Sequence, residues 1–511
     1  MFVRVLVLLA LILCTLCCDP AERSAQPRAE EHEAAAEKPA VHMPQPFPPL
    51  VAADCAEQAA TVADSLPEVT DADDLRKVVI DGAVELSAGP ILGAITDRSV
   101  TVWVRANRPS PWRIKLWPLA QAKEARLVEG DEPTLVHDLT SALRIDALLP
   151  GTTYQYQVIL GAVGKGTVSL PIKSFHTLPA SGTASKLRIA VGADIAGEDK
   201  QPIFSAIEGI KPDILLLIGD QIYADKLKPS FPEFARKYEH NWNIPELNAL
   251  MQSVPTFMIW DDHEIEDNYF HGASDVRYRP ARLAYSLYAH AHNPAPIRPG
   301  ELYYSFEAGD VSFFVLDDRS HRSDPKLEDG DGKSMLGERQ KADLAHFLKC
   351  SPGKIKVLVS PVVISKHARG NDSWNSYDAE RAQILDFIER ERVDNLIVLS
   401  GDQHWSAVFM HDLPATRFYE FLPTPLSKEI GHATRVPATD IIARDDDNFV
   451  FGVVDLDTTV EPATVAFTLC ALGRPCRPGE EPAPVSGLDE EGERENVPFT
   501  VKLTELDFGP R

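Results

Sequence analysis

The sequence predicts an α/β domain that follows a small all-β domain. After Ser185, short apolar runs alternate with stretches of helical pattern, which is typical of a sheet whose strands are covered on both faces. Residues 84–178 instead contain short segments in which apolar and polar residues alternate between turn signals, which is typical of a β-sandwich. At roughly 150 residues per domain, a chain of 511 residues has room for two to four such units.

The composition is that of a globular protein with a strongly acidic surface. Apolar residues make up 44% and charged residues 25%, which excludes wholesale disorder, a fibrous repeat and a polytopic membrane protein. The formal net charge is −25, and a surface of that sign repels the phosphate backbone of nucleic acids. We therefore expect no nucleic-acid partner, although a local cation could still hold a small anionic substrate.

Residues 1–18 have the pattern of an export signal. Arg4 precedes an apolar run that is too short to span a membrane but suits the apolar core of a secretory signal. A cysteine at the end of this run resembles a bacterial lipoprotein signal, with a lipid on Cys17 or Cys18 that would attach the protein to a membrane; the alternative is an ordinary cleaved signal peptide. We expect an exported protein that is periplasmic, lipid-anchored or secreted.

Residues 19–83 are rich in Pro, Ala and Glu in their first part and are predicted to form a tether between the signal and the folded domains. Export permits disulfide bonds. A Cys470–Cys476 or a Cys55–Cys350 bond is compatible with the sequence, but the pairing cannot be settled from sequence.

The segment over residues 84–178 is predicted to be a structural β domain. Val100–Arg105 and Trp112–Trp117 alternate apolar and polar residues, and a Pro-Gly turn at Pro150 precedes a strand that contains Tyr154 and Tyr156. The Pro-Gly-Thr-x-Tyr-x-Tyr pattern resembles the corner tyrosine of fibronectin type III modules. We interpret its aromatic residues as core, with no sign of chemistry.

In the α/β domain, five predicted strands end in acidic or histidine residues. The strands and the residues that follow them are 187–192 with Asp194, 214–218 with Asp220, 256–260 with Asp262 and His263, 311–316 with Asp317, and 396–400 with Asp402 and His404. A single such Asp is usually a helix cap or a loop hydrogen-bonder. Because ligands bind beyond the carboxyl ends of parallel strands, five such ends predict one rim. Carboxylates crowded there repel one another unless cations lie between them, which predicts a metal site.

Four ordered motifs carry a resemblance to a known family. They are Asp194-Ile195-Ala196, Gly219-Asp220-Gln221-Ile222-Tyr223, Asp261-Asp262-His263-Glu264 and Gly401-Asp402-Gln403-His404. This series resembles the purple acid phosphatase branch of the metallophosphoesterases. Trp260 before the third motif, the Leu-Asp-x-Arg-x-x-Arg pattern at 316–322 and the front β domain look more like the alkaline phosphatase D (PhoD-like) family.

The resemblance implies a fold and domain boundaries. It covers about residues 84–458 and implies a four-layer αββα metallophosphoesterase sandwich over residues 185–470, behind the fibronectin III-like domain. Residues 450–456 and 463–469 are predicted to pair as antiparallel strands that close a sheet of this sandwich. Residues 471–511 form a C-terminal part in which 473–498 are predicted as a loop and 499–503 as a strand.

The resemblance also implies a metal centre. Asp194, Asp220, Tyr223 and His404 match the ligands of an Fe(III) site, which suits hard anionic donors. Asp220 would bridge to a second metal.

The other ligands of that second metal match Asp262 and Asp402, with Asn268 as a further candidate. Carboxylates at these positions favour Ca²⁺, Mg²⁺ or Mn²⁺ over Zn²⁺, and the resemblance implies iron with calcium. A usual histidine ligand from the strand over 357–364 is not obvious; His367 is either that ligand or a surface histidine.

A mechanism follows from this set. A hydroxide held between two cations would attack phosphorus in line, without a phosphoenzyme intermediate. His263 would protonate the leaving group, unless it makes a core hydrogen bond. Asp225 and Asp261 are interpreted as residues that orient the ligands or the acid.

Arg319 and Arg322 have two interpretations. They could bind the phosphate of the substrate through paired hydrogen bonds, or they could pair with surplus carboxylates such as Asp317 and Asp318.

We therefore predict an exported, metal-dependent hydrolase of phosphoric esters, monomeric, acting on a small phosphoester. The ester could instead be a monoester, a phospholipid head group or a wall polymer, which loops 226–248 and 324–337 would decide. The alternative from another class is a cell-surface binding or adhesion protein with an inactive phosphatase-like domain. No Gly-x-Ser-x-Gly motif lies near a strand end, which argues against a serine esterase.

Overall fold

The computed structural model describes residues 50–52, 55, 66–71, 74–76, 83–162, 166–330, 332–368, 370–432, 440–476, 478 and 498–502. The predicted export signal, the first part of the predicted tether and most of the predicted loop over 473–498 lie outside the described residues. Within the described residues, no helix has both the length and the apolar character needed to cross a membrane.

The N-terminal domain is built of antiparallel strands in two sheets, as its alternating segments predict. Its strands are β1 Leu86–Gly93, β2 Val100–Ala106, β3 Trp112–Pro118, β4 Arg126–Gly130, β5 Thr140–Ile145, β6 Thr153–Leu160, β7 Val168–Ser169 and β8 Lys173–His176. One sheet has the order β1-β2-β5, and the other has the order β4-β3-β6-β7 with β8 also paired to β6. Trp103 and Trp112 are fully buried, so the aromatic residues here are core, as predicted.

A contact of the predicted corner tyrosine is present in this domain. The Leu149 backbone N–H donates to Tyr154 Oη at 3.0 Å, which ties the start of β6 to the turn before it. The fibronectin III-like identity of the domain stays a prediction.

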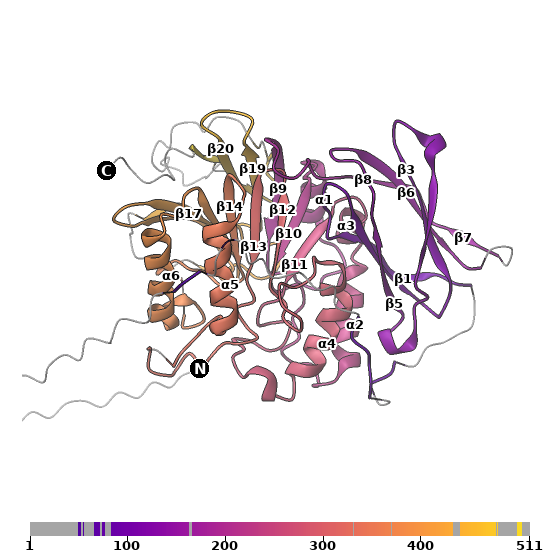
Figure 1. Ribbon diagram of the computed structural model, residues 1–511. Coiled ribbons are helices and arrows are strands. Elements are labelled where there is room, and N and C mark those ends of the chain that lie inside the picture. Colours follow the sequence, from indigo (N-terminus) through magenta and orange to yellow (C-terminus); the bar gives the residue numbers. More distant parts are fainter. Residues whose placement is uncertain are drawn as a thin grey trace, which may run out of the picture. The chain divides into compact units, whose positions relative to one another are not determined.

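The second domain contains two larger sheets, which confirms the α/β class (Figure 1). Its strands are β9 Lys186–Gly192, β10 Ile214–Ile218, β11 Thr256–Ile259, β12 Tyr304–Ala308, β13 Val311–Val315, β14 Ile355–Ser360, β15 Leu396–Ser400, β16 Ser406–Asp412, β17 Arg417–Leu422, β18 Ile441–Asp445, β19 Val450–Asp457, β20 Thr464–Ala471 and β21 Pro498–Lys502. The sheet orders are β11-β10-β9-β19-β20-β21 and β12-β13-β14-β15-β17-β16-β18. β19 and β20 pair antiparallel, as predicted, and β19 also pairs with β9.

The two sheets face each other, and helices cover the outer face of the seven-stranded sheet. Along β13, Phe313 and Val315 pack into the core shared with β9 and β10, whereas Phe314 packs into a second core with the helices α5 and α6. This alternation follows from the period of two along a strand. The helices are α1 Pro202–Gly209, α2 Phe231–Trp242, α3 Pro245–Met251, α4 Tyr278–Tyr288, α5 Gly337–Cys350 and α6 Asp378–Arg390. Burial on both faces explains why the strands are almost continuously apolar.

Part of the predicted tether packs on the folded domains instead of remaining a free linker. A disulfide joins Cys55 to Cys350 at the end of α5. Arg76 forms ion pairs with Asp138 of the β domain, at 3.0 Å, and with Glu239 of α2. The prediction of a tether is therefore wrong for these positions, because a covalent bond and a half-buried charge cluster offset the low apolar content of the segment.

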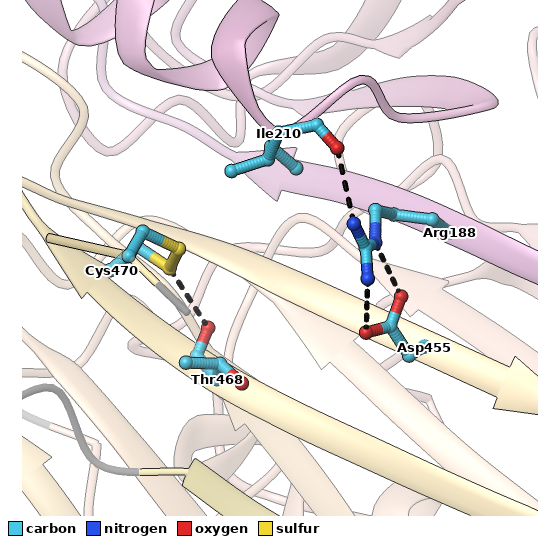
Figure 2. Close-up of a disulfide and its surroundings, with 6 residues drawn as sticks. Arg188, Ile210, Asp455, Thr468 and Cys470 are labelled. Carbon is cyan, nitrogen blue, oxygen red and sulfur yellow. Dashed lines mark hydrogen bonds and ion pairs between the residues drawn. A yellow bond between two sulfur atoms is a disulfide. The ribbon is translucent and has the colours of Figure 1, made fainter. Parts of the chain in front are cut away.

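An ion pair joins the amino-terminal half of β9 to the neighbouring strand β19. Arg188 of β9 pairs with Asp455 of β19 at 2.7 Å, and its Nη1 donates to the carbonyl of Ile210 just after α1 at 3.2 Å (Figure 2). The same view includes the disulfide of Cys470, whose partner is Cys476. The two disulfides considered above, Cys55–Cys350 and Cys470–Cys476, are both present.

Candidate metal centre

The carboxyl ends of strands from both sheets meet at one place. β9, β10 and β11 run parallel in one sheet, and β13, β14 and β15 run parallel in the other. Asp194 follows β9, Asp220 follows β10, and His404 follows β15 of the other sheet. One ligand atom from each lies within 4.8 Å of the other two. The predicted convergence of these strand ends is therefore present.

Two further groups of ligand atoms extend the first. Asp220, Asp262 and His263 form one within the same 4.8 Å limit, and Asp261, Asp262 and Asp402 form the other. Asp220 belongs to the first and second groups, and Asp262 belongs to the second and third. The three groups are thus continuous, because Asp220 and Asp262 each belong to two of them.

Five of the predicted site residues have a left-handed backbone conformation, which is unfavourable for residues that carry a side chain. The φ angles are positive at Asp194 (63°), Asp220 (54°), Asn268 (56°), Asp402 (75°) and His404 (57°). Left-handed backbone is uncommon for residues other than glycine, and it concentrates where a fold positions functional groups.

Tyr223 joins the first group through its hydroxyl. Tyr223 Oη donates to Asp220 Oδ2 at 3.3 Å and lies 3.0 Å from His404 Nε2. Burial, and then the negative charge of Asp220, raise the pKa of Tyr223 well above its usual range. We call Asp194, Asp220, Tyr223 and His404 the tyrosine group; these are the four residues predicted to hold Fe(III).

The protonation of the carboxylates fits a cation site. Burial, and then the charges of Asp262 and Asp261, raise the pKa of Asp220 well above its usual range. Burial and the charge of Asp372 do the same to Asp402. A nearby cation would favour the charged form of each group.

Unused hydrogen-bonding capacity points the same way. Both carboxylate oxygens of Asp194 are buried and make no hydrogen bond within the described part of the chain. Buried carboxylate oxygens without partners are costly. The residues present therefore fit metal ions bound through oxygen and imidazole ligands.

Asn268 lies beside the second group, but its described contact is made by the backbone. Its N–H donates to Asp262 Oδ2 at 2.5 Å. This bond orients Asp262, and a ligand role for the Asn268 carboxamide stays a prediction.

The two predicted arginines are fully buried among carboxylates. Arg319 Nε donates to Asp261, its Nη1 lies 2.9 Å from Asp372 Oδ2, and its Nη2 lies 3.4 Å from Asp262 and 3.8 Å from Asp402. We call Arg319 and these four aspartates the arginine group.

Arg322 contacts the same aspartate, Asp372, as Arg319 does. It pairs with Asp372 through Nη2, and its Nε donates to Tyr377 Oη at 2.9 Å. The two arginines therefore do pair with carboxylates, as the second interpretation predicts, but not with its two examples. The side chain of Asp317 instead accepts from Trp260 Nε1, and that of Asp318 accepts from the hydroxyl of Ser360.

His263 is oriented by Asp225, as predicted for that aspartate. Asp225 Oδ1 lies 2.6 Å from His263 Nδ1, and Asp262 Oδ2 lies 4.0 Å from Nε2. Burial lowers the pKa of His263, but Asp262 and Asp225 outweigh it and raise the pKa to about 10. The imidazole of His263 is therefore protonated at neutral pH when no metal ion is bound nearby.

Three features were missed by the sequence reasoning. Glu264 is fully buried and accepts backbone N–H groups of Asp261, at 2.7 Å, and of Gln221, at 2.5 Å, so it clamps the loops after β10 and β11 together. Its place in the Asp-Asp-His-Glu motif was a signal that could have assigned this role. The other two are Asp372 and the segment over 423–431, and neither has a local sequence pattern that predicts its role.

His367 lies outside the three groups of ligand atoms found among the described residues. Its Nε2 is 2.7 Å from Asp440 Oδ1, so it forms an ion-pair contact at the start of β18. The metal-ligand alternative for His367 therefore has no support from the geometry.

Comparison with known proteins assigns the chain to a family. The model of the PhoD-like phosphatases matches residues 190–467, which is more than half of the chain. This protein belongs to the PhoD-like phosphatase family. As a PhoD-like phosphatase it is a metal-dependent phosphoesterase. A family described as a domain of unknown function (DUF7800) matches residues 83–173, in the β domain.

Two curated PhoD-like or purple acid phosphatases are similar in sequence. Alkaline phosphatase D of Bacillus subtilis (strain 168) is 24% identical over 398 residues, which cover 66% of this chain and 67% of that protein. Purple acid phosphatase 23 of Arabidopsis thaliana is 26% identical over 287 residues, which cover 51% of this chain and 55% of that protein.

Two solved structures share the fold of this PhoD-like chain. The structure of PhoD superposes with a TM-score of 0.63 at 20% identity, covering 75% of this chain and 89% of that one. Purple acid phosphatase PPD1 from yellow lupin superposes with a TM-score of 0.58 at 14% identity, covering 81% and 74%.

Proposed function

We propose that this PhoD-like chain is an exported hydrolase of small phosphoric esters with a centre of two or more metal ions. The position of Asp220, shared between two groups of ligand atoms on strand ends of one rim, is the observation that carries the proposal. A carboxylate shared between two cation sites would hold two ions close together, and phosphoryl transfer at a two-metal site requires such closely spaced ions.

The residues divide between two sites. Asp194, Asp220, Tyr223 and His404 would hold Fe(III), because phenolate and carboxylate are hard donors. Asp220, Asp262 and Asp402, with Asn268 as a further ligand, would hold Ca²⁺, with Mn²⁺, Mg²⁺ or Zn²⁺ as substitutes. When bound, the ions would lower the pKa of a water molecule and neutralise charge on the phosphate oxygens.

The chain's own residues would then complete the reaction. His263, held at Nδ1 by Asp225, would carry on Nε2 the proton that the leaving oxygen receives after in-line attack by water. Arg319 and Arg322 would bind the phosphate. Nη1 of Arg322 makes no hydrogen bond within the described residues and retains donors for an anion, whereas Nη2 of Arg319 already lies 3.4 Å from Asp262 and 3.8 Å from Asp402.

The remaining assignments are also proposals. We propose a monomer with no nucleic-acid partner, in the periplasm, secreted, or attached to a membrane by a lipid on Cys17 or Cys18. We further propose that the catalytic domain is a four-layer αββα sandwich and that the β domain is fibronectin III-like. A binding or adhesion protein with an inactive centre is the alternative, but it does not explain buried acidic groups that converge from both sheets.

Metal analysis combined with activity tests this proposal. The purified protein is expected to contain iron, to be coloured by a tyrosine-to-iron absorption band, and to hydrolyse p-nitrophenyl esters of phosphate in a calcium-dependent way. Removal of the metals by a chelator should abolish hydrolysis, and iron with calcium should restore it. Colourless, iron-free protein with full activity would exclude the ferric site, and metal-loaded protein without hydrolysis of any phosphoester would favour the binding-protein alternative.

A further inference from the structure

The segment that follows β17, residues 423–431, is hydrogen-bonded to two residues of the tyrosine group, Asp194 and His404. The Lys428 N–H donates to the carbonyl of Asp194 at 3.0 Å, and the Glu429 carbonyl lies 2.9 Å from His404 Nδ1. These bonds join the segment to residues that follow strands of both sheets. The position of Lys428 is therefore tied to the position of the candidate ligands.

The ammonium of Lys428 lies against Tyr223. Its Nζ is 4.3 Å from the centre of the Tyr223 ring, which is the geometry of a cation–π contact. The ring of His263 lies 4.2 Å from the same ring, between centroids. The Lys428 side chain is 27% exposed, so its ammonium is accessible to a solute beside Tyr223.

The charge of Lys428 is not consumed by a strong partner. Its neighbour Glu429 is 79% exposed and lies 3.7 Å from Nζ, which is a surface pair worth about 0–1 kcal/mol. Arg319 differs, because its guanidinium is fully buried and faces four aspartates. Lys428 therefore offers positive charge beside the tyrosine group that a bound anion can use.

We propose that Lys428 is a specificity-determining residue that favours phosphate monoesters over diesters. A monoester carries a charge of about −1.5 to −2 at neutral pH, whereas a diester carries a single negative charge. An ammonium at the rim stabilises the second charge of the monoester and gains less from a diester. This inference rests on the proposed hydrolase function and adds the substrate class to it.

Three variants of the full chain test the inference: Lys428→Met, Lys428→Arg and Lys349→Met. Lys349 is a matched control, because it also pairs with a glutamate, Glu391, at 2.9 Å. It lies at the end of α5, before β14 begins, and therefore near the amino ends of the strands, whereas the candidate centre lies at their carboxyl ends. We expect Lys428→Met to lower kcat/KM for p-nitrophenyl phosphate about tenfold and for bis(p-nitrophenyl) phosphate less than about threefold. Lys428→Arg should keep the preference, and Lys349→Met should match the wild type.

Binding of inorganic phosphate separates this inference from the proposed function. Isothermal titration calorimetry of protein reconstituted with iron and calcium should show a Kd about five to ten times higher for Lys428→Met than for the wild type and for Lys349→Met. An unchanged Kd, or equal losses on the monoester and the diester, would overturn the role of Lys428. If the wild type hydrolysed neither ester, the proposed function would fail, while the Kd comparison would still decide whether Lys428 binds phosphate.

Discussion

The tyrosine group and the arginine group balance their negative charge in different ways. Within the described residues, no arginine or lysine forms an ion pair with Asp194 or Asp220. In the arginine group, a fully buried guanidinium touches four aspartates, and the charge of Arg319 helps to lower the pKa of Asp262 to about 2 despite its burial. A fold can thus compensate buried carboxylates with its own cation or leave them for an ion from solution. We infer that the tyrosine group depends on the ion and that the arginine group is preformed.

The sharpest way to break this comparison is Asp220→Asn. Loss of the shared carboxylate weakens both cation sites, and metal catalysis supplies several kcal/mol of transition-state stabilisation. We therefore expect kcat/KM for a chromogenic phosphodiester to fall by at least about a thousandfold. Metal content measured on the same preparation should fall with the activity.

Asp213→Asn is the matched control for that variant. Asp213 immediately precedes β10, whereas Asp220 follows it, and Asp213 accepts the backbone N–H of Arg188 at 2.7 Å, which an asparagine oxygen can also do. Activity within about twofold of the wild type is expected for the control. An active Asp220→Asn protein with its metals retained would remove the shared-ligand role.

The arginine group is tested by Arg319→Met in protein stripped of metal. Removing one partner from a buried ion pair leaves an uncompensated charge on Asp261, which costs about 3–5 kcal/mol, whereas Asp372 keeps its pair with Arg322. Urea unfolding should show that loss, whereas Arg236→Met, which removes a surface pair with Glu233 at 2.7 Å, should cost less than about 1 kcal/mol. A stable but inactive Arg319→Met protein would mean that Arg319 acts on substrate without stabilising the group.

Much of the fold and of the tyrosine group could be predicted, because both depend on local patterns. The strands β10 and β15 are buried apolar runs, so the sequence places their boundaries and the polar residues that follow them. Parallel pairing aligns the carboxyl ends of the strands within each sheet, and the packing of the two sheets against each other then brings Asp220 and His404 together.

The rest depends on contacts that leave no local pattern. Asp372 contacts the two arginines from a loop that lies 53 residues after Arg319 and 50 residues after Arg322, and no pattern in the neighbouring sequence identifies it. The segment that carries Lys428 is bound to Asp194 through backbone N–H groups, which every residue except proline has. The Cys55–Cys350 bond joins residues 295 apart, and its partner choice depends on the folded chain.

Asp372→Asn sharpens the comparison within the arginine group. Asparagine keeps the size and an acceptor but removes the charge that holds Arg319 and Arg322 in place. We expect KM for a phosphodiester to rise about tenfold, with kcat changed less than about threefold. Asp378→Asn, which alters a 70% exposed aspartate paired with Arg381, should leave both constants unchanged. A loss confined to kcat would contradict a role in positioning the phosphate-binding arginines.

The smallest expected effect concerns the proton donor that lies between the two groups. Asp225 helps to raise the pKa of His263, so Asp225→Asn should lower that pKa relative to the wild type. Because a general acid must be protonated, activity falls as pH rises through its pKa, and the falling limb of the pH–kcat profile should move to lower pH in the variant. At neutral pH we expect a loss of kcat of about threefold to tenfold, since the imidazole also loses its orienting charge. Asp267→Asn is the control, because Asp267 is 65% exposed and 3.8 Å from His263 Nε2, and a smaller displacement is expected. An unmoved limb in Asp225→Asn would assign the leaving-group proton to another residue.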